Sequence, residues 1–139
     1  MTASTLGRRL AAAAGVVILP VLIGCGADRV QMRGTVTYDG NPIDNGTIVF
    51  VPDGGDSRPK TATRITDGKY EFEPNFGPLP GKYKVEITWD KKTGRKVSTG
   101  DADSRDETKQ VLPSQFNTQT TLTAEIKRGE TTLDFHLPK

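Results

Sequence analysis

Cys25 is the residue of this 139-residue chain with the most distinctive chemistry, because it is the only cysteine. A thiolate is a nucleophile that can be alkylated, oxidised or bound to a metal. A domain stabilised by disulfide bonds within the chain is excluded, because there is only one cysteine. A zinc site built from cysteine and histidine is also excluded, because His136 is the only histidine. The chemistry open to Cys25 therefore depends on the segment that leads to it.

The segment before Cys25 has the composition of an export signal. Arg8 and Arg9 are its only charged residues, and an uncharged stretch of 15 residues follows them from Leu10 to Gly24. This stretch is shorter than the roughly 20 residues of a membrane-spanning helix. It is typical of the apolar core of a secretory signal behind a positive amino end. We expect residues 1–24 to be a cleaved signal peptide.

The end of this segment resembles a bacterial lipobox. Leu22, Ile23 and Gly24, two aliphatic residues and a small one, stand directly before Cys25. The resemblance implies that diacylglycerol is attached to the Cys25 thiol. It also implies that signal peptidase II recognises Leu22, Ile23 and Gly24 and cuts before Cys25. The alternative is an ordinary export signal with an incidental cysteine.

A lipid at Cys25 would place the protein in the cell envelope. Residues 25–29 would be the lipidated amino end and a very short tether, so the domain from residue 30 would lie close to the membrane. Gly26 is not the aspartate that, in known lipoproteins, causes retention in the inner membrane. If the cell has two membranes, we expect the outer one.

The charge of the remaining chain argues against a nucleic-acid partner. The chain has 19 basic and 17 acidic residues, and all the acidic ones follow position 24. Removal of the segment with Arg8 and Arg9 leaves a formal charge of zero. No basic excess then remains to neutralise phosphates.

Residues 30–139 are predicted to form one all-β domain. Apolar side chains alternate with polar ones in several short runs, and no run keeps a helical period. Frequent turn residues separate the runs, and no crossover helices are available for a parallel sheet. We therefore expect an antiparallel sandwich of about seven strands. The alternating residues are Val30, Met32, Val36 and Tyr38; Tyr83, Val85, Ile87 and Trp89; Leu122, Ala124 and Ile126; and Leu133, Phe135 and Leu137.

Turns and loops complete this scheme. Asp67-Gly68 predicts a two-residue hairpin of type I′, and Asn45-Gly46 predicts another turn. The apolar run 48–51 predicts a central strand covered on both sides. Segment 53–60 is predicted to be a loop. The polar segment 90–110 is predicted to be a long loop with an edge strand near residues 95–98 and disorder after it.

The order of several short motifs resembles carboxypeptidase regulatory-like domains, which are transthyretin-like, Ig-like β-sandwiches. The similarity extends from residue 34 to the carboxyl end, whose last strands are similar to those of short bacterial lipoproteins built from this one domain. In carboxypeptidases the domain accompanies a zinc peptidase domain and is not itself catalytic. The motifs are GTV at 34–36, GNPI at 40–43, TDGKY at 66–70 and LPGKYKV at 79–85.

The residues of the domain favour a structural or binding role over catalysis. His136 alternates with Phe135 and Leu137 and should face solvent, so we expect no enzyme and no cofactor. Envelope proteins or polysaccharides are the expected partners. The alternative function is a carbohydrate- or peptide-binding module that uses the 53–60 and 90–110 loops.

Four residues near the long loop are candidates for ligand binding. Asp101, Asp103 and Asp106 are clustered oxygen donors of the kind that calcium prefers. Arg105 lies among them and no glycine supports a calcium loop, so we favour a solvated loop and predict no metal site. Trp89 stands at the end of a strand beside the loop. We expect it to pack in the core, and to be more exposed than Tyr38 or Tyr83.

Overall fold

The structure is a computed structural model that describes residues 28–55, 57–98, 100, 104–129 and 132–139. The predicted signal peptide, the lipobox residues Leu22, Ile23 and Gly24, and Cys25 lie outside the described residues. Asp101 and Asp103 also lie outside them. The structure therefore does not test the predictions made for these residues.

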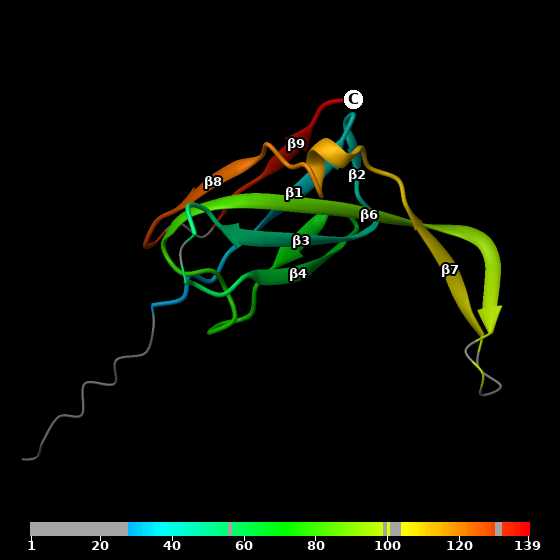
Figure 1. Ribbon diagram of the computed structural model, residues 1–139, viewed down its shortest axis with the longest axis horizontal. Coiled ribbons are helices and arrows are strands. Elements are labelled where there is room, and N and C mark those ends of the chain that lie inside the picture. Colours follow the sequence, from blue (N-terminus) through cyan, green and yellow to red (C-terminus); the bar gives the residue numbers. More distant parts are fainter. Residues whose placement is uncertain (1–27, 56, 99, 101–103, 130–131) are drawn as a thin grey trace, which may run out of the picture.

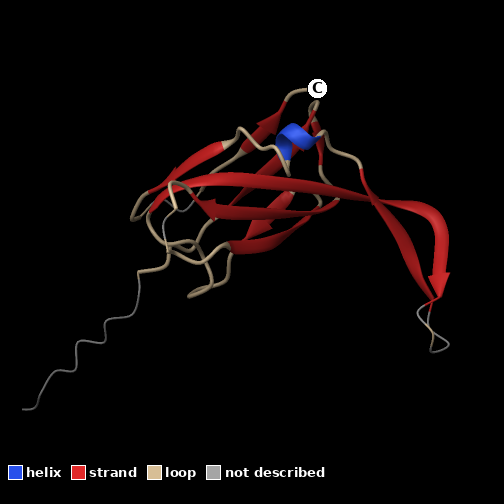
Figure 2. Ribbon diagram, in the orientation of Figure 1, coloured by secondary structure: helices blue, strands red, loops and turns tan. Residues whose placement is uncertain are grey.

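The described residues form an all-β domain, as the alternation predicted (Figure 2). It contains nine strands and one short 3-10 turn, η1 (Ser114–Phe116). Several strands are only two to four residues long, whereas β6 is by far the longest. The strands are β1 (Arg33–Tyr38), β2 (Asn41–Pro42), β3 (Asn45–Pro52), β4 (Thr61–Thr66), β5 (Lys69–Glu71), β6 (Gly81–Ser98), β7 (Ser104–Gln110), β8 (Thr123–Ile126) and β9 (Phe135–Leu137).

The strands are joined in the order β2-β1-β5-β4-β3-β6-β7, with β8 added to β6 and β9 added to β1. Neighbouring strands are antiparallel except for β1 and β9, which are parallel. Figure 1 shows β8 and β9 along one side of the body and β3 and β4 along the other. The apolar faces meet between these layers, so the architecture is that of a sandwich.

The core is built from the residues that alternate along the strands. In β6, Tyr83, Val85 and Ile87 are buried, whereas the side chain of Lys84 is exposed. This confirms the predicted register of that strand. Phe50 of β3 lies at the centre of the core, where its ring contacts four other aromatic rings at centroid distances of 5.7–6.5 Å. These rings belong to Tyr70, Phe72, Tyr83 and Phe135.

Two turn predictions have opposite outcomes. Asp67 and Gly68 both have positive φ, 50° and 74°, and connect β4 to β5, as a type I′ hairpin requires. The predicted turn at Asn45-Gly46 is wrong. These residues begin β3, and Gly46 is buried opposite Trp89 in the sheet.

The run 48–51 is central in the sheet but is not fully covered on both faces. β3 lies between β4 and β6, and Ile48 and Phe50 are completely buried. Val49 and Val51 are half-buried on the other face. The strand therefore has one face in the core and one partly solvent-exposed face, because no second layer of described residues covers its outer side.

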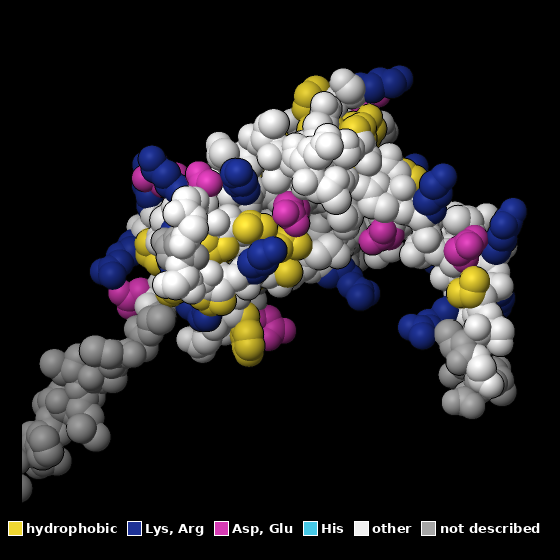
Figure 3. All heavy atoms as spheres, viewed as in Figure 1, with side chains coloured by type: hydrophobic (Ala, Val, Ile, Leu, Met, Phe, Trp, Pro, Cys, Tyr) yellow, Lys and Arg dark blue, Asp and Glu magenta, His cyan; other side chains and the backbone are white. Residues whose placement is uncertain are grey.

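The long polar segment 90–110 is a β-hairpin, not the predicted loop. β6 continues beyond the body to Ser98 and pairs with β7, with a register shift between Lys92 and Lys96. The predicted edge strand near 95–98 lies within β6. Figures 1 and 3 show this hairpin, which we name the arm (described residues 90–98 and 104–110), projecting from one end of the body.

Candidate functional site

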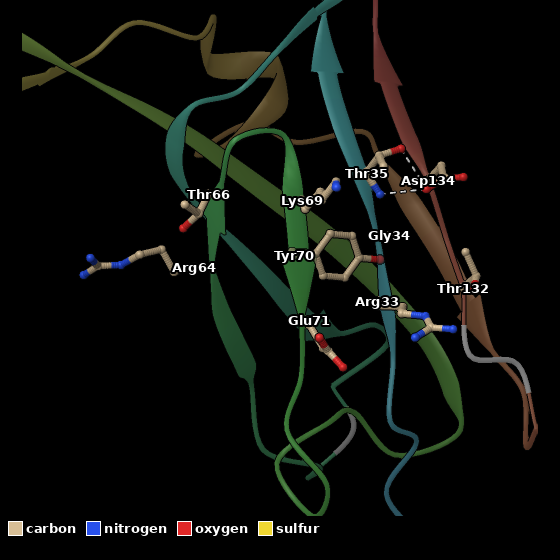
Figure 4. A pocket seen from close by; sticks show the side chains of 10 residues that line it. All are labelled: Arg33, Gly34, Thr35, Arg64, Thr66, Lys69, Tyr70, Glu71, Thr132 and Asp134. Carbon is tan, nitrogen blue, oxygen red and sulfur yellow. Dashed lines mark hydrogen bonds between the residues drawn. The ribbon is translucent and has the colours of Figure 1, made fainter.

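A hollow lies on the outer surface of β1, β4 and β5, beside the segment that leads into β9 (Figure 4). Its volume is about 560 Å³. Strand pairing places its residues, because partners that lie opposite each other in neighbouring strands point to the same face. The lining residues are Arg33, Gly34, Thr35, Arg64, Thr66, Lys69, Tyr70, Glu71, Thr132 and Asp134.

Two cross-strand rows form the polar wall of this hollow. Lys69 of β5 pairs with Thr35 of β1 on one side and with Thr66 of β4 on the other. In the next row, Glu71 of β5 pairs with Arg33 of β1. The rows bring cations, a carboxylate and hydroxyl groups from three strands onto one surface.

The floor depends on a close approach between β1 and the chain that leads to β9. A Cβ atom added at Gly34 would lie 1.9 Å from the carbonyl oxygen of Leu133, so only glycine fits there. Tyr70 reaches the same carbonyl and donates a hydrogen bond of 2.7 Å to it. Burial, with a smaller effect of the Asp134 charge, raises the pKa of Tyr70 well above its ordinary value. The phenol therefore remains protonated and acts as a structural donor.

Asp134 forms a charged rim of the hollow. Its Oδ1 accepts hydrogen bonds from the Thr35 backbone N–H at 2.7 Å and from the Thr35 hydroxyl at 2.8 Å. The backbone bond and then the hydroxyl bond lower the pKa of Asp134 below its ordinary value. The carboxylate is thus ionised at neutral pH, and its second oxygen is left to accept other donors.

Three cationic residues, Arg33, Arg64 and Lys69, line the hollow, and Figure 4 shows the Arg64 side chain extending away from the other two. Within the described part of the chain, the side chains of Arg33, Arg64 and Lys69 make no ion pair and no hydrogen bond. Such groups bind carboxylates or phosphates readily, and arginine can do so with two parallel hydrogen bonds. The hollow can therefore hold an anionic group beside several hydroxyl donors and acceptors.

No family model, curated protein or solved structure matches this chain. The resemblance to carboxypeptidase regulatory-like domains stays a prediction. The residues of the hollow are the starting point for an assignment of function.

Trp89 is a core residue and not an exposed binding platform. Only 8% of its surface is exposed, and its ring packs edge-on against Tyr38 at a centroid distance of 6.2 Å. Its indole N–H donates to Asp44, and this bond lowers the pKa of that carboxyl. Lys91 covers the ring, with Nζ 4.0 Å from the centroid. The prediction that Trp89 is more exposed than Tyr38 is wrong, because Tyr38 is half-buried.

Asp106 is paired within the arm. It forms an ion pair of 2.7 Å with Lys92 on the opposite strand, and both side chains are exposed. The hydrogen bond from Lys92 is the main cause of a lowered pKa at Asp106. In the described residues, no three side chains of the metal-binding types come together. Asp106 therefore lies on a strand of the arm, and its negative charge is already paired with the ammonium group of Lys92.

His136 faces solvent, as its position in the alternation predicted. Its Nδ1 lies 2.9 Å from the hydroxyl of Thr37, which is half-buried. The nearby carboxylate of Asp134 is held by Thr35, not by the imidazole. The pair lacks the ordered carboxylate–histidine–hydroxyl chain that activates a nucleophile.

Segments 53–60 and 90–110 lie at opposite ends of the body. Pro52, before the first segment, pairs with Tyr83, whereas Gly46 pairs with Trp89, just before the arm. Six residues of strand separate these pairs, which corresponds to about 20 Å. The two segments do not form one surface for a small ligand.

The sequence alternation does not by itself reveal the cations of the hollow, because it distinguishes buried from exposed faces but not which exposed residues come together. Arg33, Thr35, Arg64 and Thr66 have the parity opposite to the buried residues of β1 and β4. That parity places them on an outer face, but only the pairing of the strands brings them together.

No helix of the described residues is long and apolar enough to span a membrane.

Proposed function

We propose that this chain is a non-catalytic, lipid-anchored protein of the cell envelope that binds acidic polysaccharide in the hollow of β1, β4 and β5. The observation that carries the proposal is the set of three cations, Arg33, Arg64 and Lys69, that line the hollow without ion-pair partners in the described chain. These groups supply the charge that recognises the carboxylates of an acidic sugar.

The remaining lining residues suit the hydroxyl groups of a sugar chain. Thr66 and Thr132 can donate and accept hydrogen bonds, and Glu71 and Asp134 can accept them. Tyr70 is almost completely buried, so its ring gives no stacking surface. Recognition would therefore be polar and electrostatic, and binding should weaken as salt is added.

The anchor places the hollow near the polymers of the envelope. Asp28, the first described residue, follows the expected lipidated Cys25 by three residues, so the chain between them spans at most about 11 Å. A diacylglycerol group holds a protein stably at a membrane, in contrast to a single acyl chain. The domain would stay within a short distance of the membrane surface for its lifetime.

The proposal is tested by binding the purified lipidated protein, in detergent micelles, to polygalacturonate and to neutral dextran. We expect saturable binding to the acidic polymer only. Arg33→Ala combined with Arg64→Ala should weaken it about tenfold or more, because each charged hydrogen bond contributes about 1.5–3 kcal/mol. Lys82→Ala combined with Lys84→Ala removes the same charge from the exposed face of β6 and should have little effect.

Two outcomes would overturn the assignment of the hollow. One is equal binding to dextran and to polygalacturonate, which would show that charge does not select the ligand. The other is equal loss of binding in both double variants, which would show a general effect of net charge.

A further inference from the structure

The outer edge of β7 is a seven-residue strand edge without a partner in the described chain. β7 (Ser104–Gln110) pairs with β6 on one side only. Nearly every described side chain of the arm is exposed, and no other described element covers either of its faces. An isolated two-stranded ribbon is at best marginally stable in water, whereas additional strands stabilise a sheet. The edge is therefore suited to receive another strand.

The backbone pattern shows which residues face this edge. The N–H of Val111 donates to the carbonyl of Trp89 at 3.0 Å, so Val111 directs its backbone groups toward β6. In an antiparallel ladder the direction alternates from one residue to the next. The backbone groups of Ser104, Asp106, Thr108 and Gln110 consequently point to the free edge.

The charges of β7 are self-complementary in one antiparallel register. We infer that β7 pairs with β7 of a second copy of this chain, with Thr108 opposite Thr108 at the two-fold axis. This register places Glu107 opposite Lys109 of the second copy, and Lys109 opposite its Glu107. Opposite charges and paired threonines both stabilise cross-strand contacts.

Neighbouring symmetric registers are unfavourable. With Glu107 at the axis, two glutamates face each other and Arg105 lies opposite Lys109. With Lys109 at the axis, two lysines meet directly. With Asp106 at the axis, two aspartates meet directly, although Arg105 then lies opposite Glu107 of the other copy. Like charges in opposed positions destabilise a sheet. Among these registers, the one centred on Thr108 combines opposite charges with no like-charge pair, so the charge pattern favours Thr108 as the centre.

The arm projects from one end of the body, so no other described element covers the free edge of β7 (Figures 1 and 3). The self-complementary charges of this edge favour a second copy as the occupant. Lys92 and Asp106 remain paired within each copy. The inference concerns the arm alone and does not depend on the ligand of the hollow.

Disulfide trapping tests the register. Thr108→Cys in the full chain, with Cys25→Ser to leave one thiol, should form a cross-linked dimer on mild oxidation in detergent micelles. Asp106→Cys is the matched control on the same edge. In the inferred register the two residues 106 lie about 14 Å apart, beyond the roughly 7 Å limit for a disulfide. Cross-linking of both variants or of neither would overturn the inference.

Charge exchange tests the same contact without a thiol, by sedimentation of the full chain in detergent. Lys109→Glu places glutamates opposite each other twice and should weaken the dimer about tenfold. Glu107→Lys combined with Lys109→Glu restores opposite charges and should restore the dimer, whereas Lys84→Glu on the body should leave it unchanged. A monomeric unmodified chain, or a dimer indifferent to Lys109→Glu, would overturn the inference. Preferential pairing with a strand of another protein would do the same.

Discussion

Val85 and Lys84 are neighbours in β6 with opposite environments. Val85 is completely buried among the rings and aliphatic chains of the core, whereas the Lys84 side chain is exposed. The difference arises from the two-residue period of a strand, which directs successive side chains to opposite faces. The same charged substitution at the two positions therefore separates the effect of burial from the effect of charge.

We expect Val85→Asp to lower the free energy of unfolding by several kcal/mol, because it buries a carboxylate without a partner. This is a large part of the roughly 5–15 kcal/mol that stabilises a typical domain. Lys84→Asp should cost less than about 1 kcal/mol. Denaturant titration measures both values, and similar losses in the two variants would contradict the register of β6.

Asp134 should contribute to the pH dependence of stability. Its pKa in the folded protein is lowered below the ordinary value of 3.8 by the Thr35 backbone N–H and then by the Thr35 hydroxyl. A lowered folded-state pKa means that the stabilisation is complete above about pH 4. It is lost as the pH falls through the folded-state pKa.

Asp134→Asn should therefore flatten the acid side of the stability curve. We expect the thermal midpoint of the unmodified protein to fall more steeply below pH 4 than that of the variant. Asp39→Asn, which alters an exposed carboxylate in the β1–β2 turn, is the control. If both variants follow the same curve as the unmodified protein, the Thr35 hydrogen bonds do not stabilise the charged form.

β6 is one continuous strand with two different environments. From Gly81 to Trp89 alternate side chains are buried against the core, and from Lys91 to Ser98 all side chains are exposed. The body ends where Lys91 covers the ring of Trp89. The stability of the body should then depend on the first half of the strand and not on the second.

Replacement of residues 93–107 by Asn-Gly should leave the thermal midpoint of the body within a few degrees. This deletion keeps the pairing of Lys92 with Thr108, and none of the described side chains that it removes is buried. The same variant should lose the dimer, because it lacks most of β7. A midpoint lowered by about 10 °C or more, equivalent to roughly 1–3 kcal/mol for a domain of this size, would show that the arm supports the core.

At the scale of the whole molecule, the closing of the sheet places the groups of the hollow together. β9 lies parallel to β1, and the chain just before β9 brings Thr132 and Asp134 beside Arg33 and Thr35. These residues are about a hundred positions apart in the sequence. The hollow therefore exists only in the complete domain, held near the membrane by its expected anchor.

Cys25→Ala should abolish membrane residence. Cys25 is the only thiol, so a thioether-linked lipid has no other attachment site. We expect the variant to incorporate no labelled fatty acid and to accumulate as a precursor that signal peptidase II does not cut. Labelling in intact cells, followed by fractionation, measures both effects. A correctly trimmed unmodified protein that carries no lipid and washes off membranes would contradict the anchor.

Local patterns were sufficient for features that depend on neighbouring residues. The alternation in β6 predicted its buried face, and Asp67-Gly68 predicted a hairpin, because side-chain parity and turn conformation are decided within a few residues. The export signal is also a local pattern, and it stays a prediction here. The sequence of the arm predicts a loop and not a hairpin, because neither face of the arm is buried and its strands therefore carry no apolar alternation.

The sequence by itself determined that this protein is all-β, and it determined which side chains of β6 form the core. Both follow from the short period of a strand. Only the tertiary structure decided that Arg33, Arg64 and Asp134 share one hollow, that Trp89 is covered, and that β9 pairs parallel with β1. These facts depend on pairing between distant segments, and that pairing follows from the packing of the whole core.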